Sequence, residues 1–144
     1  MNSEEEVKTQ SQEPTAVTQE ALDLGERLLE YGAGIIRLVE GLAANTLVGR
    51  RMADQLLRTG TSVGANYEEA TAAESQEDCV HKLQLARKEL RESNYWLRLL
   101  LKSGKISTER LGNLLDESNQ LGAILSKSLA TVKGHVKEKA SDPS

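Results

Sequence analysis

At 144 residues the chain is long enough for one domain with a modest core. It contains no Phe, one Trp and two Pro, and its composition favours long helices over strands. The formal net charge is −4, but residues 1–23 hold six acidic side chains against one lysine, so the remainder is near neutral. That balance is not typical of a strongly basic nucleic-acid-binding domain.

The sequence also indicates in which cellular compartment the protein is expected. Cys79 is the single cysteine, so no intrachain disulfide can form, and the acidic start lacks the apolar stretch of a secretory signal. No run approaches the roughly 18 apolar residues that suggest a membrane span. We therefore expect a cytoplasmic protein.

Residues 1–18 are rich in Glu, Gln, Ser and Thr and show no apolar period, which predicts a disordered acidic arm. A first helix is expected near 19–43, where apolar residues recur at steps of four and three. A second helical stripe runs from Met52 to Ala70, although its glycines and serines lower helix propensity.

The clearest helix is expected from about 75 to 103, with a capping residue at Ser75 and an end at Gly104. A fourth apolar stripe follows it. Short connections imply antiparallel neighbours, so the sequence predicts an all-α, up-down four-helix bundle over residues 19–133. The polar residues 134–144 are expected to form a flexible C-terminal tail.

The third predicted helix carries a basic ridge on its far face, which a bundle core does not require. We define this ridge as Lys88, Arg91, Tyr95, Arg98 and Lys102. Such a ridge can follow the phosphates of a nucleic acid, with the tyrosine stacked on an unpaired base, or bind another acidic partner. The alternative is an ordinary solvated helix face.

A flank of the same helix adds Leu85, Trp96 and Leu99, which widen its apolar arc beyond one core seam. Either a neighbouring helix covers this flank or it forms a subunit interface, where Trp is a frequent anchor. We favour the interface and expect the chain to self-associate.

Motifs for catalysis or metal binding are not found. Ser62, Asn66 and Glu69 lie in a small-residue segment, and we interpret them as a structural motif that fixes helix register. A di-iron bundle needs two Glu-x-x-His motifs, and this chain offers one weak analogue at residues 78–81. Because phosphate-binding glycine loops, serine elbows and HExxH motifs are also missing, we expect no metal, no cofactor and no enzymatic activity.

Two segments, SVGANYEEA at 62–70 and HKLQLARKELRESNYWLRLL at 81–100, resemble one family. They are similar to bacterial four-helix-bundle proteins of the 23S rRNA intervening-sequence type, which are related to accessory variability proteins of retroelements. The resemblance implies an up-down bundle that assembles as a ring-like homopentamer. In the retroelement branch it implies nucleic acid, or a nucleic-acid enzyme, as the partner. It implies no catalytic residue.

The leading hypothesis is therefore a non-enzymatic, homo-oligomeric interaction or scaffold protein. The alternative is an RNA- or DNA-binding accessory factor that acts through the basic ridge. Neither hypothesis involves a membrane or a small-molecule substrate.

Overall fold

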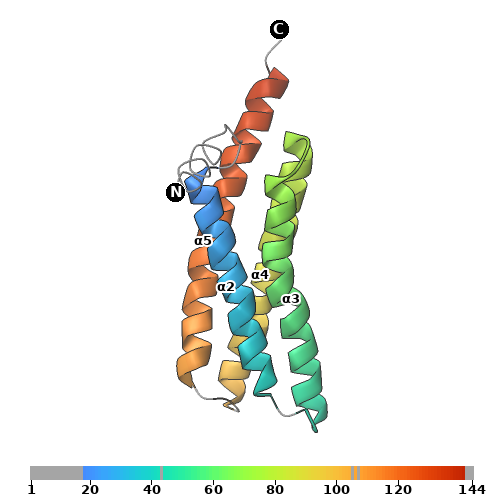
Figure 1. Ribbon diagram of the computed structural model, residues 1–144, viewed down its shortest axis with the longest axis vertical. Helices are drawn as coiled ribbons and strands as arrows, with labels where there is room; N and C mark the ends of the chain where they lie inside the picture. Colours follow the sequence, from blue (N-terminus) through green and yellow to red (C-terminus); the bar gives the residue numbers. More distant parts are fainter. Residues whose placement is uncertain (1–17, 43, 105, 107, 142–144) are drawn as a thin grey trace, which may run out of the picture.

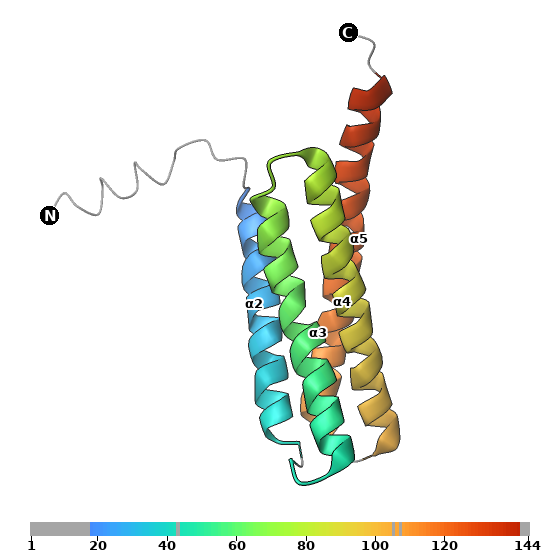
Figure 2. The same cartoon turned by 90° about the vertical axis from the view of Figure 1, so that its right-hand side faces the viewer.

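The structure is a computed structural model, and it describes residues 18–42, 44–104, 106 and 108–141. Its four long helices are α2 (Gln19–Glu40), α3 (Leu47–Thr71), α4 (Gln76–Ser103) and α5 (Thr108–Ser141). They lie side by side and alternate in direction, as Figures 1 and 2 show. The predicted all-α, up-down four-helix bundle is confirmed. Apart from Thr18, the predicted acidic arm at 1–18 lies outside the described residues.

The helices follow one another around the bundle. Helix α3 packs against α2 and α4, and α5 packs against α4 and α2. Helices α2 and α4 therefore occupy opposite corners. None of the described helices combines the length and the apolar composition that a membrane crossing requires.

Side-chain caps define where three of the helices begin. The hydroxyl groups of Thr18, Thr46 and Ser75 each accept a hydrogen bond from the backbone N–H three residues further on, at 3.0–3.1 Å. These contacts satisfy N–H groups that have no partner within the helix. Gly104 ends α4 in the left-handed conformation, with φ at 68°. The expected cap at Ser75 and end at Gly104 are both observed.

Helix α5 is longer than expected. It continues through Gly134 to Ser141, where we expected a flexible tail at 134–144, and its last turns rise past the other helices (Figure 2). A Cβ at Gly134 would meet nothing within 4 Å, so this glycine marks no crowded turn. The Lys, Glu and Ala residues that follow favour helix, which explains why the polar composition does not end it.

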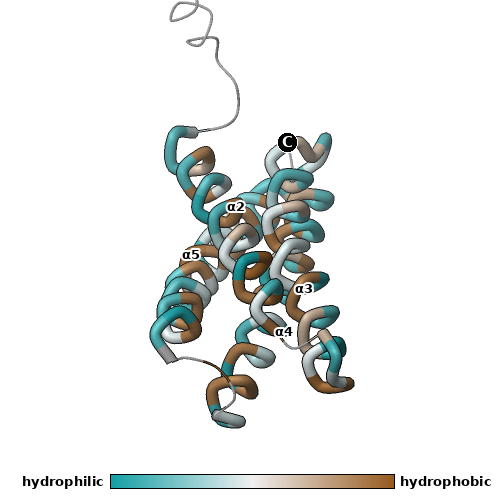
Figure 3. The backbone as a smooth tube through the Cα atoms, turned by 60° about the horizontal axis from the view of Figure 1, so that its bottom comes forward, coloured by the Kyte–Doolittle hydropathy of each residue, from teal (hydrophilic) through white to brown (hydrophobic). Residues whose placement is uncertain are grey.

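The core is built from the apolar stripes of all four helices. Apolar positions, brown in Figure 3, recur along each helix between polar ones. Leu28, Ile35, Leu56, Leu97 and Leu125 are among the side chains that are almost fully buried. Burial of this kind supplies most of the stability of such a bundle.

Glycines bring α2 and α3 unusually close together. A Cβ added to Gly60 would lie 2.6 Å from Cγ1 of Ile35, and one added to Gly64 would lie 3.6 Å from the backbone of Leu28. The small residues that weaken the helical pattern of α3 thus lie where α2 approaches it. Packing compensates for their low helix propensity.

One buried polar contact joins the opposite corners of the bundle. The hydroxyl group of Tyr31 on α2 lies 2.8 Å from Oγ of Ser93 on α4. Because Ser93 donates to the carbonyl oxygen of Leu90 at 2.9 Å, the Tyr31 hydroxyl is the donor in this pair. Burial raises the pKa of Tyr31 to about 12, and the hydrogen bond to Ser93 offsets part of the rise.

The close contact at Gly60 predicts that replacing this glycine with alanine destabilises the protein, although the same replacement usually stabilises a helix. Helix propensity alone favours Gly60→Ala by about 1 kcal/mol, whereas overpacking against Ile35 costs about 1–3 kcal/mol. We expect Gly60→Ala to lower the free energy of unfolding in urea. The control is Gly112→Ala on α5, where nothing lies within 4 Å of the added Cβ, and it should be stabilising. A Gly60→Ala variant more stable than wild type would contradict the close packing.

Tyr31 predicts a loss of stability at high pH. The unfolded side chain loses its proton near pH 10, while the folded one keeps it to about pH 12. The folded state therefore binds more protons in this window, and the free energy of unfolding falls by about 1.4 kcal/mol per pH unit. Urea unfolding of Tyr31→Phe should show a shallower fall than wild type between pH 10 and 12. If the free energy of unfolding falls equally with pH in both proteins, Tyr31 is not responsible for the loss of stability.

Candidate interaction surface

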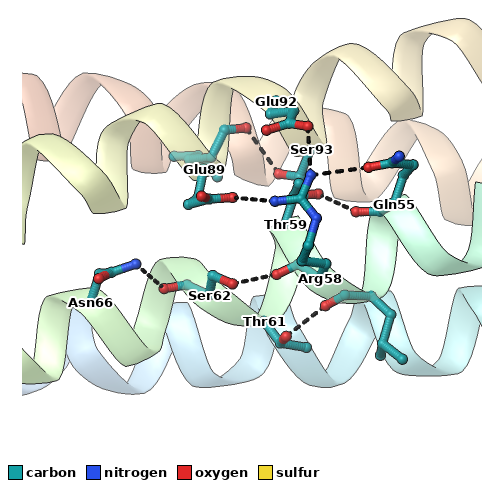
Figure 4. Close-up of polar contacts among 11 residues, drawn as sticks. Gln55, Arg58, Thr59, Thr61, Ser62, Asn66, Glu89, Glu92 and Ser93 are labelled. Atoms are coloured by element: carbon teal, nitrogen blue, oxygen red, sulfur yellow. Dashed lines mark hydrogen bonds and ion pairs between the residues drawn. The ribbon is translucent and has the colours of Figure 1, made fainter.

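The flank of Leu85, Trp96 and Leu99 lies on the α3 side of helix α4. Arg58 of α3 pairs with two glutamates of this stripe, Glu92 at 2.8 Å and Glu89 at 3.6 Å (Figure 4). These ion pairs hold that side of α4 against α3. Helix α3 therefore lies beside the glutamates of this flank.

The three side chains of this flank are not equally accessible. Leu85 and Trp96 are half-buried, and Trp96 packs against the core. Nε1 of Trp96 is buried and has no hydrogen-bond partner among the described residues. Leu99, in contrast, is 43% exposed. Of the three residues predicted at an oligomer interface, Leu99 is the one most accessible to a partner.

The structure places the whole basic ridge on the surface. Lys88, Arg91, Tyr95, Arg98 and Lys102 are all exposed. The guanidinium carbon of Arg98 lies 5.8 Å from the centre of the Tyr95 ring, within cation–π distance. No ion pair within the described part of the chain neutralises the four cations of the ridge. The ridge is therefore available to an acidic partner.

Tyr95 and Leu99 add an apolar component to this basic surface. Tyr95 is 49% exposed, and it lies one helical turn from Leu99. Its ring meets Trp96 edge to face, with 5.2 Å between the ring centroids. The half-buried tryptophan thus supports the exposed tyrosine. We call Tyr95, Leu99 and the four cations of the basic ridge the α4 patch.

A second exposed apolar surface, which the sequence reasoning missed, runs along α2. Leu22, Leu29 and Ile36 are 54%, 66% and 42% exposed. Their seven-residue spacing places them on one face of the helix, and we call them the α2 stripe. The spacing was visible in the sequence. The core residues of the same helix form a stronger periodic pattern.

Acidic side chains surround the α2 stripe. Glu26 lies one turn from Leu22 and from Leu29, and Glu40 lies one turn from Ile36. Oε1 of Glu68 on α3 lies 3.1 Å from where a Cβ of Gly25 would be, beside the same face. None of these three glutamates forms an ion pair with another described residue.

Ser62, Asn66 and Glu69 do not form one joint contact. The hydroxyl group of Ser62 donates to the carbonyl oxygen of Arg58, and Nδ2 of Asn66 donates to that of Ser62 at 3.0 Å (Figure 4). Both hydrogen bonds stay within α3, and Glu69 is exposed. These bonds satisfy the polar groups of Ser62 and Asn66 within α3.

The surface pockets of the described residues bring together no recognisable catalytic or metal-binding groups. One of about 410 Å³ lies between α2 and α5, and an ion pair of 2.9 Å from Arg27 to Glu117 lines it. Among the described residues no three His, Cys, Asp or Glu side chains gather as metal ligands would. Burial raises the pKa of the Cys79 thiol, and the carboxylate of Asp78 adds to the rise, so this thiol is not activated as a nucleophile.

The fold and its exposed surfaces define an up-down four-helix-bundle protein with charged and apolar outer faces. The chain belongs to the 23S rRNA-intervening sequence protein family, whose model matches residues 17–127. The resemblance seen in the sequence is thereby confirmed.

A solved structure supports the same assignment. It is the crystal structure of a protein with unknown function from the S23 ribosomal protein family of Bacteroides thetaiotaomicron. The two chains are 31% identical with a TM-score of 0.68, and the match covers 78% of this chain and 99% of the other. No curated protein matches the chain. Neither description names an enzymatic activity.

Proposed function

We propose that the protein is a non-enzymatic interaction protein that associates with copies of itself through the outer faces of α2 and α4. The observation that carries the proposal is the aligned exposure of large apolar side chains in the α2 stripe. Single exposed leucines are ordinary. A leucine or isoleucine at every seventh position on one outer face is instead the arrangement that helices use to pack on another helix.

Burial of these positions favours association. Burying one leucine or isoleucine side chain contributes about 1.5–3 kcal/mol, and the α2 stripe offers three such side chains. The α4 patch adds Tyr95, an amphipathic residue type that is enriched at interfaces. The family resemblance implies a homopentamer, and we propose that stoichiometry.

Self-association predicts that the molecular mass of the protein in solution depends on the α2 stripe. Light scattering of the wild-type protein should give several times the chain mass, and Leu29→Lys should lower it because a cation replaces an apolar contact. The matched control is Leu47→Lys, since Leu47 is 63% exposed at the start of α3 and outside the α2 stripe. A monomeric wild type at all concentrations would refute the proposal.

A second function, nucleic-acid binding through the basic ridge, is favoured by one observation. The ridge presents four cations without acidic partners among the described residues, and Tyr95 offers an exposed ring on which a base can stack. This spacing of cations along a helix suits a phosphate backbone.

Nucleic-acid binding predicts a strong dependence on salt. Affinity for a labelled structured RNA should fall steeply as salt is raised, and Arg91→Ala should reduce the slope of log affinity against log salt by about one. Lys127→Ala on α5, an exposed lysine outside the ridge, should leave the slope unchanged. No binding at low salt would exclude this function.

A further inference from the structure

We infer that a pocket between α4 and α5 binds the edge of an unpaired nucleobase through two asparagine side chains. This site deepens the proposed nucleic-acid binding, on which it rests, because it names the part of the strand that is recognised beyond phosphates and stacking. The pocket has a volume of about 180 Å³, and we call it the α4–α5 pocket. Its lining includes Arg91, Asn94, Arg98, Ser118, Asn119 and Gly122.

The α4–α5 pocket combines positive charge with neutral polar groups. Arg91 and Arg98 lie seven residues apart on the exposed side of α4, which is about 10 Å along the helix. No carboxylate of the described residues lines the pocket, and neither arginine forms an ion pair with one. A strand of RNA can therefore keep its phosphates near these cations while one of its bases turns into the pocket.

A chain of hydrogen bonds fixes the orientation of the Asn94 amide. The hydroxyl group of Ser118 donates to the carbonyl oxygen of Leu115 at 2.9 Å, so toward Asn94 its oxygen acts as an acceptor. It accepts from Nδ2 of Asn94 at 2.6 Å, and the same Nδ2 donates to Oδ1 of Asn119 at 3.1 Å. Both amide hydrogens of Asn94 are thus used, and its Oδ1 remains as an acceptor.

The same chain leaves a donor close to this acceptor. Oδ1 of Asn119 already accepts from Asn94, so the side chain of Asn119 offers the hydrogens of its Nδ2. No described residue accepts from this Nδ2, and none donates to Oδ1 of Asn94. Asn119 is exposed and Asn94 is half-buried, so a ligand can reach both. The pocket therefore presents one donor and one acceptor on neutral side chains.

An unpaired base carries the matching pair of groups. The edge of adenine has an amino donor beside a ring-nitrogen acceptor, and asparagine is a side chain that pairs with this edge. Sequence-specific RNA recognition uses such edges of unstacked bases. In the pocket the amino group of the base faces Asn94, and its ring nitrogen faces Asn119. The exposed ring of Tyr95, beside Arg98, is then placed to stack on a neighbouring base of the strand.

Gly122 keeps the pocket open on the α5 side. A Cβ at this position would lie 3.8 Å from Cδ2 of Leu90, which is an ordinary van der Waals contact. The fold therefore tolerates a side chain here, but a large one would fill the pocket. The volume of about 180 Å³ is below the range of about 300–1,000 Å³ that holds drug-sized ligands, so the pocket suits one planar ring system.

Three single-stranded RNAs of equal length test the contact with the base edge. Oligo(A) offers phosphates, stacking and the adenine edge, whereas a strand of N6,N6-dimethyladenosine keeps phosphates and stacking but lacks the amino donor. An abasic strand keeps the phosphates alone. Fluorescence anisotropy at low salt measures the affinity of the protein for each. We expect oligo(A) to bind about fivefold more tightly than the dimethylated strand, because one hydrogen bond is lost.

Variants locate this preference at the pocket. Asn119→Ala removes the donor and Gly122→Leu fills the pocket, so each should abolish the preference for oligo(A) over the dimethylated strand. Neither should change the affinity for the abasic strand, because the cations remain. The matched control is Gly112→Leu on the same helix, where nothing lies within 4 Å of an added Cβ, and it should keep the preference. Circular dichroism checks that each variant keeps its helices.

The outcomes separate this site from the proposed function. If no strand binds at low salt, the proposed nucleic-acid binding is refuted, and the base site with it. Equal affinities for oligo(A) and the dimethylated strand would overturn the base site alone and leave binding through phosphates in place. A preference that persists in Asn119→Ala would also overturn it, since the base edge is then bound elsewhere. Because Asn119 is exposed, this variant decides the question even if Gly122→Leu loses its helices.

Discussion

The contact of Gly60 with Ile35 is the constraint on which the packing of α2 against α3 depends. At that point the backbone of α3 lies against the side chain of α2, because a Cβ would leave only 2.6 Å. Two helices that meet through glycine can approach closely, because no side chain of the glycine separates them. Leu29, on the outer face of α2, is 66% exposed.

Helix α4 combines two roles that its sequence does not separate. Its inner side contributes Ser93, whose hydroxyl group receives the Tyr31 hydrogen bond and joins opposite corners of the core. Its outer side presents the basic ridge. Trp96 lies between them, half-buried against the core and in contact with the ring of Tyr95. A buried hydrogen bond of this kind is satisfied in one helix arrangement and left unsatisfied in others, so it favours a single packing.

The two proposed functions use the same cations. In self-association the ridge faces a neighbouring copy, whereas in nucleic-acid binding it faces phosphates. Self-association and RNA binding would therefore compete for Arg91 and Arg98, unless the assembly leaves part of the ridge uncovered. The description of the family refers to an intervening sequence of 23S rRNA, and that of the solved relative states an unknown function. The two functions therefore differ in what the ridge contacts, a second copy of the chain or the phosphates of a nucleic acid.

Much of this molecule could be predicted from its residues alone, because helix period, caps and short connections are local properties. The four helices, the cap at Ser75, the end at Gly104 and the exposure of the basic ridge all follow from such patterns. The end of α5 could not be predicted, since polar residues are compatible with both a helix and a tail. The periodicity of one helix shows how wide its apolar arc is, but not which neighbour covers it. Only the tertiary structure decided that Trp96 packs against the core and that Leu22, Leu29 and Ile36 are exposed, because covering depends on which neighbouring helix lies beside each face.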